Sequence, residues 1–261
     1  MNFRSSFLSS ISPIVKNLII INLIFWLATE LSPAIFRKWG IDTNLTDILG
    51  MHYWASEKFN ISQLFTYMFM HGGFGHMFFN MFSLYMFGIM LENYWGSRKF
   101  LIYYLVTGIG AGVIQQVFWT VDLNGIISAL NLSIENKSAE FLLGYQSQLE
   151  QYFRITGLEH FGYGELTELK KLYLNIPVTV GASGSVFGLL LAFGWLFPDL
   201  KIMLLFFPVP IKAKYFVMIY GVAELFLGVA RFSGDNIAHF AHLGGMLFGI
   251  ILILIWKKKR I

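Results

Sequence analysis

The sequence predicts an all-α integral membrane protein whose single domain, residues 1–261, contains six transmembrane helices. Of the 261 residues, 56% are hydrophobic and only 13% are charged, whereas soluble domains have about 45 to 50% apolar and about 25% charged residues. A helix that crosses a bilayer needs about 20 mostly apolar residues. The segments that approach this length are 15–33, 75–91, 100–119, 178–197, 215–230 and 237–256.

A seventh apolar run, residues 202–209, is too short to cross the bilayer and is interrupted by Pro208, with Pro210 directly after it. Proline lacks a backbone N–H and breaks the hydrogen-bond ladder of a helix. We therefore expect a loop or an interfacial segment here.

The positions of the basic residues predict the orientation, because Lys and Arg favour cytoplasmic segments. With a cytoplasmic N-terminus, six spans leave both termini on that side, where the acidic residues are only Glu92 and Asp199. This pattern, and an N-terminus without a cleavable signal, favour a multi-pass protein of a bacterial inner membrane, with an organellar membrane as the alternative. The basic residues assigned to that side are Arg4, Lys16, Arg98, Lys99, Lys201, Lys212, Lys214, Lys257, Lys258, Lys259 and Arg260.

Two features of the composition exclude other classes of function. The chain has no cysteine, which excludes disulfides, iron–sulfur clusters and thiol chemistry. Its net charge of +4 follows the two sides of the membrane and is not gathered into one patch, so nucleic acid is not an expected partner.

An outer insert of about residues 121–176 separates the third and fourth spans. Such a length is unusual for a loop without secondary structure. Apolar residues recur at helical spacing in SAEFLLGYQSQLEQYF and LTELKKLYL. We expect one or two amphipathic helices that lie on the outer membrane face or cover the functional site.

Polar residues occur at one depth in three spans. His76 and Asn80 are four residues apart on the second span, so they share one helical face. Ser183 lies near the start of the fourth span, and His239 and His242 lie in the first turns of the sixth. Polar groups inside a membrane helix indicate function by default. Because all three spans enter from the outer side, these residues are expected to meet in the outer third of the bilayer.

Rows of small residues on the fourth and sixth spans predict that these two helices pack closely. A serine side chain is short, so only closely packed helices can bring Ser183 Oγ within about 3 Å of a nitrogen of His242, the reach of a general base. The small residues are Gly184 and Gly188 on the fourth span and Ala241, Gly245 and Gly249 on the sixth.

These motifs resemble those of the rhomboid intramembrane serine proteases. The similar parts are GASG around Ser183, AHLGGMLFG around His242, and the spacing HxxxxHxxxN formed by His71, His76 and Asn80. The resemblance covers about residues 60–120 and 178–256, in the same order and topology. It implies a six-helix rhomboid-like bundle with an extended third outer loop.

The resemblance also implies roles for these residues. Ser183 is the nucleophile and His242 the general base of a dyad without a catalytic acid, and no Asp or Glu lies beside His242 in the sixth span. His76 and Asn80, with the backbone N–H of Ser183, form the oxyanion hole. The remaining implied positions are His71 at the entrance, Gly181, Gly184, Phe187 and Gly245 as supporting residues, and Glu92 as a structural residue near the cytoplasmic side.

The sequence differs from the family pattern at one aromatic residue and in two outer loops. Phe187 stands where the family often has a tyrosine that packs on the catalytic histidine, so stacking is retained without a hydroxyl contact. The Trp-Arg pair of the family's first outer loop is absent before His71, and the outer insert is longer than usual.

The implied activity is an endopeptidase that cleaves single-span membrane proteins within or just outside the bilayer, with neither a cofactor nor a metal. Because hydrolysis needs water, we expect a hydrated cavity that opens outward and is lined by His71, Gly72, Gly73 and residues 229–236. The substrate helix is expected to enter beside the fifth span and to unwind there.

Three alternatives accompany this interpretation. A non-catalytic rhomboid-like protein would bind transmembrane helices, but it would be expected to lack the serine or the histidine. Imidazoles are common metal ligands, but with no cysteine and only Asp235 nearby a metal site is disfavoured. His239 is favoured as a polar residue at a helix start over a second base, and Glu224, a carboxylate within the fifth span, has no assigned role. The histidines of the metal alternative are His71, His76, His239 and His242.

Overall fold

A computed structural model describes residues 12–204, 207–230 and 237–258. The chain divides into two compact units. The membrane unit comprises Met1–Met51, Ile61–Gln115 and Thr179–Ile261, and the insert unit comprises His52–Asn60 and Gln116–Val178. Two-residue strands stand at the boundaries between them, β1 (Met51–His52) and β2 (Val178–Thr179).

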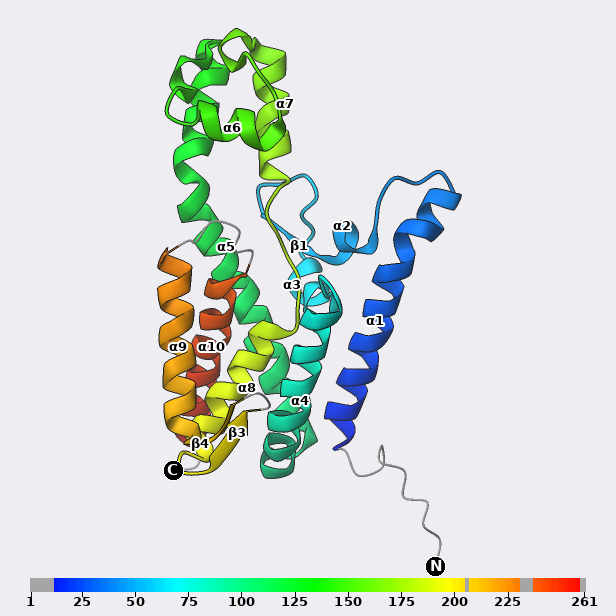
Figure 1. The fold of residues 1–261 in the computed structure, drawn as a ribbon, viewed down its shortest axis with the longest axis vertical. Coiled ribbons are helices and arrows are strands. Elements are labelled where there is room, and N and C mark those ends of the chain that lie inside the picture. Colours follow the sequence, from blue (N-terminus) through cyan, green and yellow to red (C-terminus); the bar gives the residue numbers. More distant parts are fainter. Residues whose placement is uncertain (1–11, 205–206, 231–236, 259–261) are drawn as a thin grey trace, which may run out of the picture. The chain divides into compact units, whose positions relative to one another are not determined.

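The membrane unit is a helical bundle. Within the described ranges, five helices are long and apolar enough to cross a membrane: α1 (Pro13–Lys38), α4 (Phe74–Trp95), α5 (Ser97–Asn136), α9 (Ala213–Ala230) and α10 (His239–Lys258). A sixth apolar helix, α8 (Ser183–Leu196), is shorter. With α8 included, these apolar helices alternate in direction along the chain, so α4, α8 and α10 run the same way (Figure 1). Short elements link α1 to α4: α2 (Leu45–Leu49), α3 (Gln63–Thr66) and the 3-10 helix η2 (Tyr67–Phe69).

The fourth span is shorter than the predicted segment 178–197. Its helix begins at Ser183 and has 14 residues, which corresponds to a length of about 21 Å. Gly181, with φ of 129°, precedes it, a backbone conformation that favours glycine and is incompatible with a helix. The serine therefore lies at the N-terminus of a helix, where the first N–H groups have no partner within the helix.

The third span is longer than predicted. The helix was expected over 100–119, but α5 continues to Asn136 without a break over 40 residues. No proline interrupts the sequence in this stretch, and the apolar residues beyond 119 are buried in the insert unit. The first part of the predicted insert is therefore the end of a long helix.

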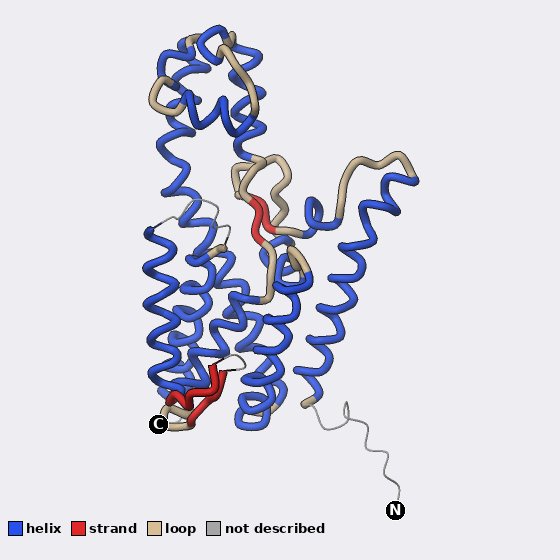
Figure 2. The backbone as a smooth tube through the Cα atoms, in the orientation of Figure 1, coloured by secondary structure: helices blue, strands red, loops and turns tan. Residues whose placement is uncertain are grey.

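The described residues of the apolar run 202–209 form no helix, as predicted, but they lie in two strands and not in a loop. Strand β3 (Lys201–Leu204) pairs antiparallel with β4 (Phe207–Lys212), and Lys201 lies opposite Lys212. The hairpin lies at the end of the bundle that also holds the C-terminal end of α10 (Figure 2). Lys212 and Lys214 both contact Asp199 at 3.0 Å, and these hydrogen bonds lower the pKa of its carboxyl group.

Glu92 connects three helices at one end of the membrane unit. Its carboxylate accepts backbone hydrogen bonds from Ile14 at 3.1 Å and Val15 at 2.9 Å, in the first turn of α1. The hydroxyl of Ser97, at the start of α5, donates to the same group at 2.5 Å. A negative charge at a helix N-terminus satisfies its N–H groups and is stabilised by the helix dipole. This arrangement accounts for a buried carboxylate near the predicted cytoplasmic side.

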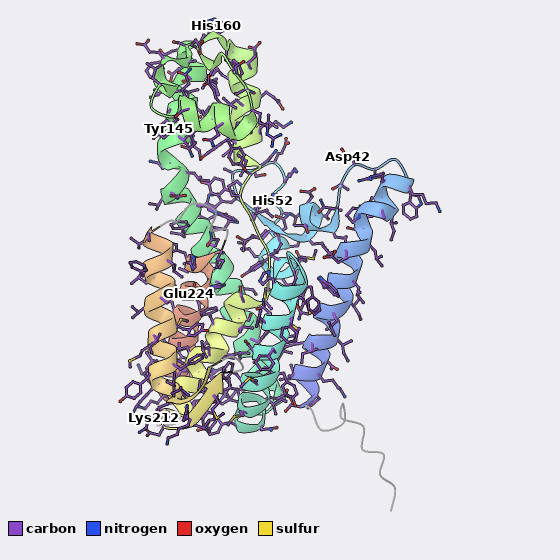
Figure 3. The ribbon with its side chains drawn as sticks, in the orientation of Figure 1. Asp42, His52, Tyr145, His160, Lys212 and Glu224 are labelled. Carbon is purple, nitrogen blue, oxygen red and sulfur yellow. The ribbon has the colours of Figure 1, made fainter. Side chains whose placement is uncertain are left out.

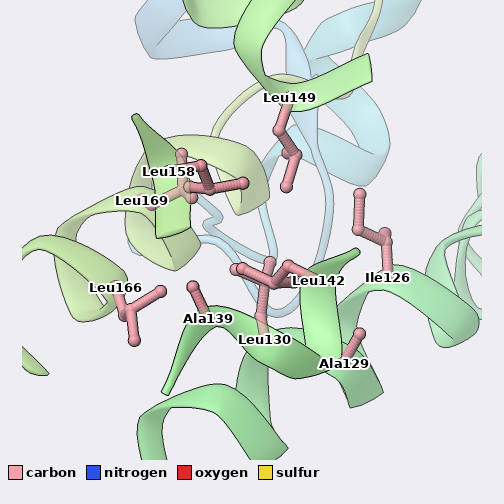
Figure 4. Close-up of a cluster of buried hydrophobic side chains, with 9 residues drawn as sticks. All are labelled: Ile126, Ala129, Leu130, Ala139, Leu142, Leu149, Leu158, Leu166 and Leu169. Carbon is pink, nitrogen blue, oxygen red and sulfur yellow. The ribbon is translucent and has the colours of Figure 1, made fainter. Parts of the chain in front are cut away.

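The insert unit has its own hydrophobic core (Figure 4). As expected, two short α-helices form here, α6 (Gln146–Phe153) and α7 (Tyr163–Leu174), together with the 3-10 helices η3 (Ala139–Leu142) and η4 (Leu158–His160). Some of their apolar side chains pack with those of α5, whereas Tyr152 on α6 and Leu172 on α7 are exposed. The buried cluster consists of Ile126, Ala129, Leu130, Ala139, Leu142, Leu149, Leu158, Leu166 and Leu169.

Candidate active site

Ser183 is held at the start of α8 by the chain before it. The N–H of Gly181 donates to the carbonyl oxygen of Tyr67 at 2.9 Å, and the Tyr67 hydroxyl donates to the carbonyl of Gly108 on α5 at 2.7 Å. The Ser183 side chain is half-buried. A serine at this position combines an accessible hydroxyl with backbone donors of a helix N-terminus.

His242 faces Ser183 from α10. Its Nε2 lies 2.8 Å from Ser183 Oγ, which is hydrogen-bonding distance, and the residue is 7% exposed. The ring of Phe187, one turn after the serine, is stacked on the imidazole with centroids 4.1 Å apart and planes 8° apart. The two residues that the motifs single out thus form a serine–histidine pair of the reach that proton transfer requires.

The pair is brought together by a close crossing of α8 and α10. A Cβ on Gly245 would overlap the carbonyl oxygen of Gly184, whereas a Cβ on Gly184 would overlap the Ala111 side chain on α5, with the Ala241 carbonyl oxygen of α10 at 3.7 Å. The predicted contact between small residues is present at this point. It does not extend to Gly188, where a Cβ would meet the side chain of Thr107 on α5.

Gly188 was predicted to face the sixth span, and this was wrong because α8 also packs tightly on α5. The Tyr103 hydroxyl donates to the Gly188 carbonyl at 2.9 Å. One turn earlier, the Ser185 hydroxyl donates to the carbonyl of Tyr104 at 2.8 Å. Hydrogen bonds to α5 therefore fix one side of α8, while the backbone of α8 at Gly184 meets Gly245 of α10.

The residues of α4 lie on the other side of Ser183. A Cβ on Gly181 would come within 2.7 Å of His76 Nε2 and 3.5 Å of Ser183 Oγ, so the His76 ring lies beside the start of α8. Asn80 is 5% exposed, and its amide nitrogen donates to the carbonyl of His76 at 2.8 Å. An amide nitrogen carries two hydrogens, so one further hydrogen bond is open to Asn80.

His71 lies before α4 and contacts His76. Their rings are 5.2 Å apart and nearly perpendicular, and His71 is 2% exposed. Burial lowers the pKa of His71 to about 4, and the nearby His76 adds to this shift. His71 is therefore a neutral, buried neighbour of His76, whereas Gly72 beside it is exposed. The rest of the predicted cavity wall includes residues 231–236, which lie outside the described residues, so the cavity stays a prediction.

Glu224 of α9 also belongs to this cluster, and no role was predicted for it. Its Oε2 lies 2.8 Å from His242 Nδ1 and 2.7 Å from His239 Nδ1. His239 is the first residue of α10, as the helix-start interpretation predicted, and is 5% exposed. Figure 3 labels Glu224 on α9 within the bundle. The signal in the sequence was the carboxylate itself, since a charge within a membrane span is expensive without partners.

The residues of this cluster are also potential ligands of a metal ion. Glu224, His239 and His242 each offer one ligand atom, and these atoms lie within 4.8 Å of one another. Carboxylate and imidazole are suitable ligands for Zn²⁺ and related ions. Here the same atoms are paired with each other, as a hydrogen-bonded carboxylate–imidazole group. The four histidines of the metal alternative fall into two pairs, since His71 and His76 pack together on the α4 side.

Comparison with known proteins agrees with the resemblance seen in the motifs. The Rhomboid domain family matches residues 58–130 and 139–259, which is more than half of the chain. Rhomboid protein 1, mitochondrial, from Saccharomyces cerevisiae is 30% identical over 164 residues, covering 62% of this chain and 44% of that protein. The chain therefore spans less than half the length of this relative. With its apolar helices and these matches, the chain belongs to the rhomboid family of multi-pass membrane proteins.

Proposed function

We propose that this protein is an intramembrane serine endopeptidase that cleaves transmembrane segments of single-span proteins. The observation that carries the proposal is the 2.8 Å contact between Ser183 Oγ and His242 Nε2 at the N-terminus of α8. A nucleophile is weak at its ordinary pKa and needs an adjacent base at this distance. The family membership supports the same reaction class.

In the proposed reaction, Ser183 Oγ attacks the carbonyl carbon of the scissile peptide while His242 Nε2 takes the hydroxyl proton. The tetrahedral intermediate collapses as the C–N bond breaks, and His242 returns the proton to the leaving nitrogen. Water then hydrolyses the acyl-serine with His242 again as the base. His242 Nε2 accepts and donates the proton in each step, and no cofactor takes part.

The oxyanion of the intermediate is assigned to the region between α4 and the start of α8. The backbone N–H of Ser183 is one donor, and His76 and Asn80 are the side-chain donors. Support comes from the His76 ring beside Gly181 and Ser183 and from the hydrogen of Asn80 that its bond to His76 leaves available. A preorganised donor of this kind typically contributes about 10²- to 10³-fold in rate.

We assign the outer side to the ends of α4, α8 and α10 at which these residues lie. Both termini are then cytoplasmic, and the substrate reaches Ser183 from the bilayer beside α9. The exposed side of α9 has a shallow apolar groove lined by Met218, Ile219, Val222, Ala223 and Phe226. The proposed location is a bacterial inner membrane, and an organellar membrane is the second candidate because the yeast relative is named as mitochondrial.

A non-catalytic rhomboid-like protein that binds transmembrane helices is the competing function. The retained serine and histidine argue against it. Purified protein in proteoliposomes, with a single-span model substrate, separates the two. We expect wild type to cut the substrate and Ser183→Ala to bind it without cutting, whereas equal product from both proteins, or none from wild type, would refute the protease assignment.

The choice of base is tested in the same assay. Loss of the base costs about 10⁶-fold in the soluble serine-protease precedent, so His242→Ala should be inactive. His239→Ala should retain measurable turnover. If His239→Ala were inactive and His242→Ala active, the wrong histidine would have been assigned.

A further inference from the structure

The carboxylate of Glu224 is shared by two histidines of the neighbouring helix. The same oxygen, Oε2, lies 2.7 Å from His239 Nδ1 and 2.8 Å from His242 Nδ1. The three residues are between 5% and 9% exposed. A carboxylate in such a place requires hydrogen-bond donors, and each of these imidazoles supplies one through Nδ1.

The direction of these hydrogen bonds fixes the tautomer of His242. A neutral imidazole carries a hydrogen on one nitrogen and a lone pair on the other. Because the carboxylate only accepts, Nδ1 of His242 must hold the hydrogen. Its Nε2 then presents a lone pair to Ser183 Oγ, 2.8 Å away. This is the tautomer in which the imidazole can take the serine proton.

The same contact places a negative charge next to the site where positive charge develops. When His242 accepts the serine proton it becomes an imidazolium ion, buried among α8, α9 and α10. Among the described residues, the groups that face it are Ser183, Phe187, His239, Glu224 and, more distantly, His76. Among these, Glu224 is the acidic residue. Electrostatic stabilisation of this kind is stronger in a water-poor site than in water.

We propose that Glu224 is the positioning residue of a Ser183–His242–Glu224 triad. The family's dyad is thus extended here by a carboxylate from α9. The carboxylate orients the His242 ring, holds the hydrogen on Nδ1 and stabilises the imidazolium, while His239 fixes the carboxylate from its other side. This inference rests on the proposed protease function, since it concerns the base of that reaction.

A purely structural role is the alternative, in which Glu224 only ties α9 to α10. The His239 contact already supplies such a tie through the same oxygen. The two roles differ in what a neutral replacement of the same shape does. Glu224→Gln keeps the size and an acceptor oxygen but removes the charge, whereas Glu224→Asp keeps the charge and shortens the side chain.

The test measures kcat and KM for a single-span substrate in proteoliposomes, with the melting temperature of each variant. In soluble serine proteases, replacing the triad carboxylate costs about 10⁴-fold in rate. We expect Glu224→Gln to lower kcat by at least about 10²-fold, with KM and the melting temperature close to wild type. Glu224→Asp should retain more kcat than Glu224→Gln, and His239→Gln should lose less than about tenfold.

Two results would refute the positioning role of Glu224. One is a kcat for Glu224→Gln within a few-fold of wild type. The other is an activity loss in Glu224→Gln that matches its loss of folded protein, with Glu224→Asp no better, which is the structural outcome. Both require an active wild type. An inactive wild type therefore refutes the protease assignment itself, and this outcome is distinguishable from refutation of the role of Glu224.

Discussion

A Cβ on Gly245 of α10 would occupy the position of the Gly184 carbonyl oxygen on α8. The two backbones are therefore as close as glycine permits at the level of the Ser183–His242 pair. Helix association in lipid depends on such contacts between small residues, and here the contact also sets the distance between nucleophile and base.

The first prediction follows from this crossing. Gly245→Ala forces α8 and α10 apart, at a cost in folding free energy of about 1–3 kcal/mol. A displacement of about 1 Å at the reacting atoms can cost about 10²-fold in rate, so activity should fall by more than the folded fraction does. The measurement is kcat alongside thermal unfolding in detergent. Gly75→Ala is the control, since a Cβ there meets nothing within 4 Å, and equal effects of both substitutions would contradict the account.

The second prediction concerns the oxyanion. Asn80→Ala should lower kcat by about 10²- to 10³-fold, because one preorganised donor is lost, and KM should change little. Kinetics with a single-span substrate check this. Met77→Leu, at a buried site three residues before Asn80 on α4, is the matched control and should stay close to wild type. An Asn80→Ala enzyme with wild-type kcat would remove Asn80 from the oxyanion hole.

The third prediction concerns the ring stacked on His242. An aromatic pair contributes about 0.5–1.5 kcal/mol beyond its buried area, so Phe187→Leu should reduce kcat by about twofold to tenfold through a less well-oriented imidazole. Phe187→Tyr keeps the stack and should remain close to wild type. Phe79→Leu, on a residue that is 54% exposed on α4, controls for loss of a ring elsewhere. Activity in Phe187→Leu equal to wild type would show that the stack does not position the base.

The sequence predicted which residues meet at the candidate site better than it predicted how the surrounding helices pack. Ser183, His242, His76 and Asn80 could be found because polar residues stand out in apolar helices and their spacing gives their depth. Gly188 was misplaced and Glu224 was left without a role because both depend on which helix packs on which face. Hydropathy identifies a span but does not say that α8 leans on α5 or that α9 directs a carboxylate at α10.

The hydropathy pattern also did not predict where the helices begin and end. Residues 178–182 are apolar enough to be counted in the fourth span, but the conformation of Gly181 delays the helix to Ser183. In α5 the opposite holds, because the helix continues after its apolar segment ends and packs in the core of the insert unit. Both differences come from tertiary contacts that override local composition.

The fourth prediction tests the membrane orientation. The chain has no cysteine, so an introduced cysteine is the only thiol of this protein, and its labelling is read on the purified protein. Ser147 on α6 and Lys201 on β3 are both exposed. In intact cells a membrane-impermeant maleimide should label Ser147→Cys, and it should label Lys201→Cys only after permeabilisation. The reverse pattern would place both termini outside and contradict the orientation inferred from the basic residues.

The most direct test of the central claim is to map the adduct of a fluorophosphonate probe on the full chain in detergent or lipid. This reagent reacts with a serine only where an adjacent base activates it. The account predicts one modified peptide, with the adduct on Ser183, and no adduct in His242→Ala. An unlabelled wild type, or the same labelling in wild type and Ser183→Ala, would contradict the claim that Ser183 is an activated nucleophile.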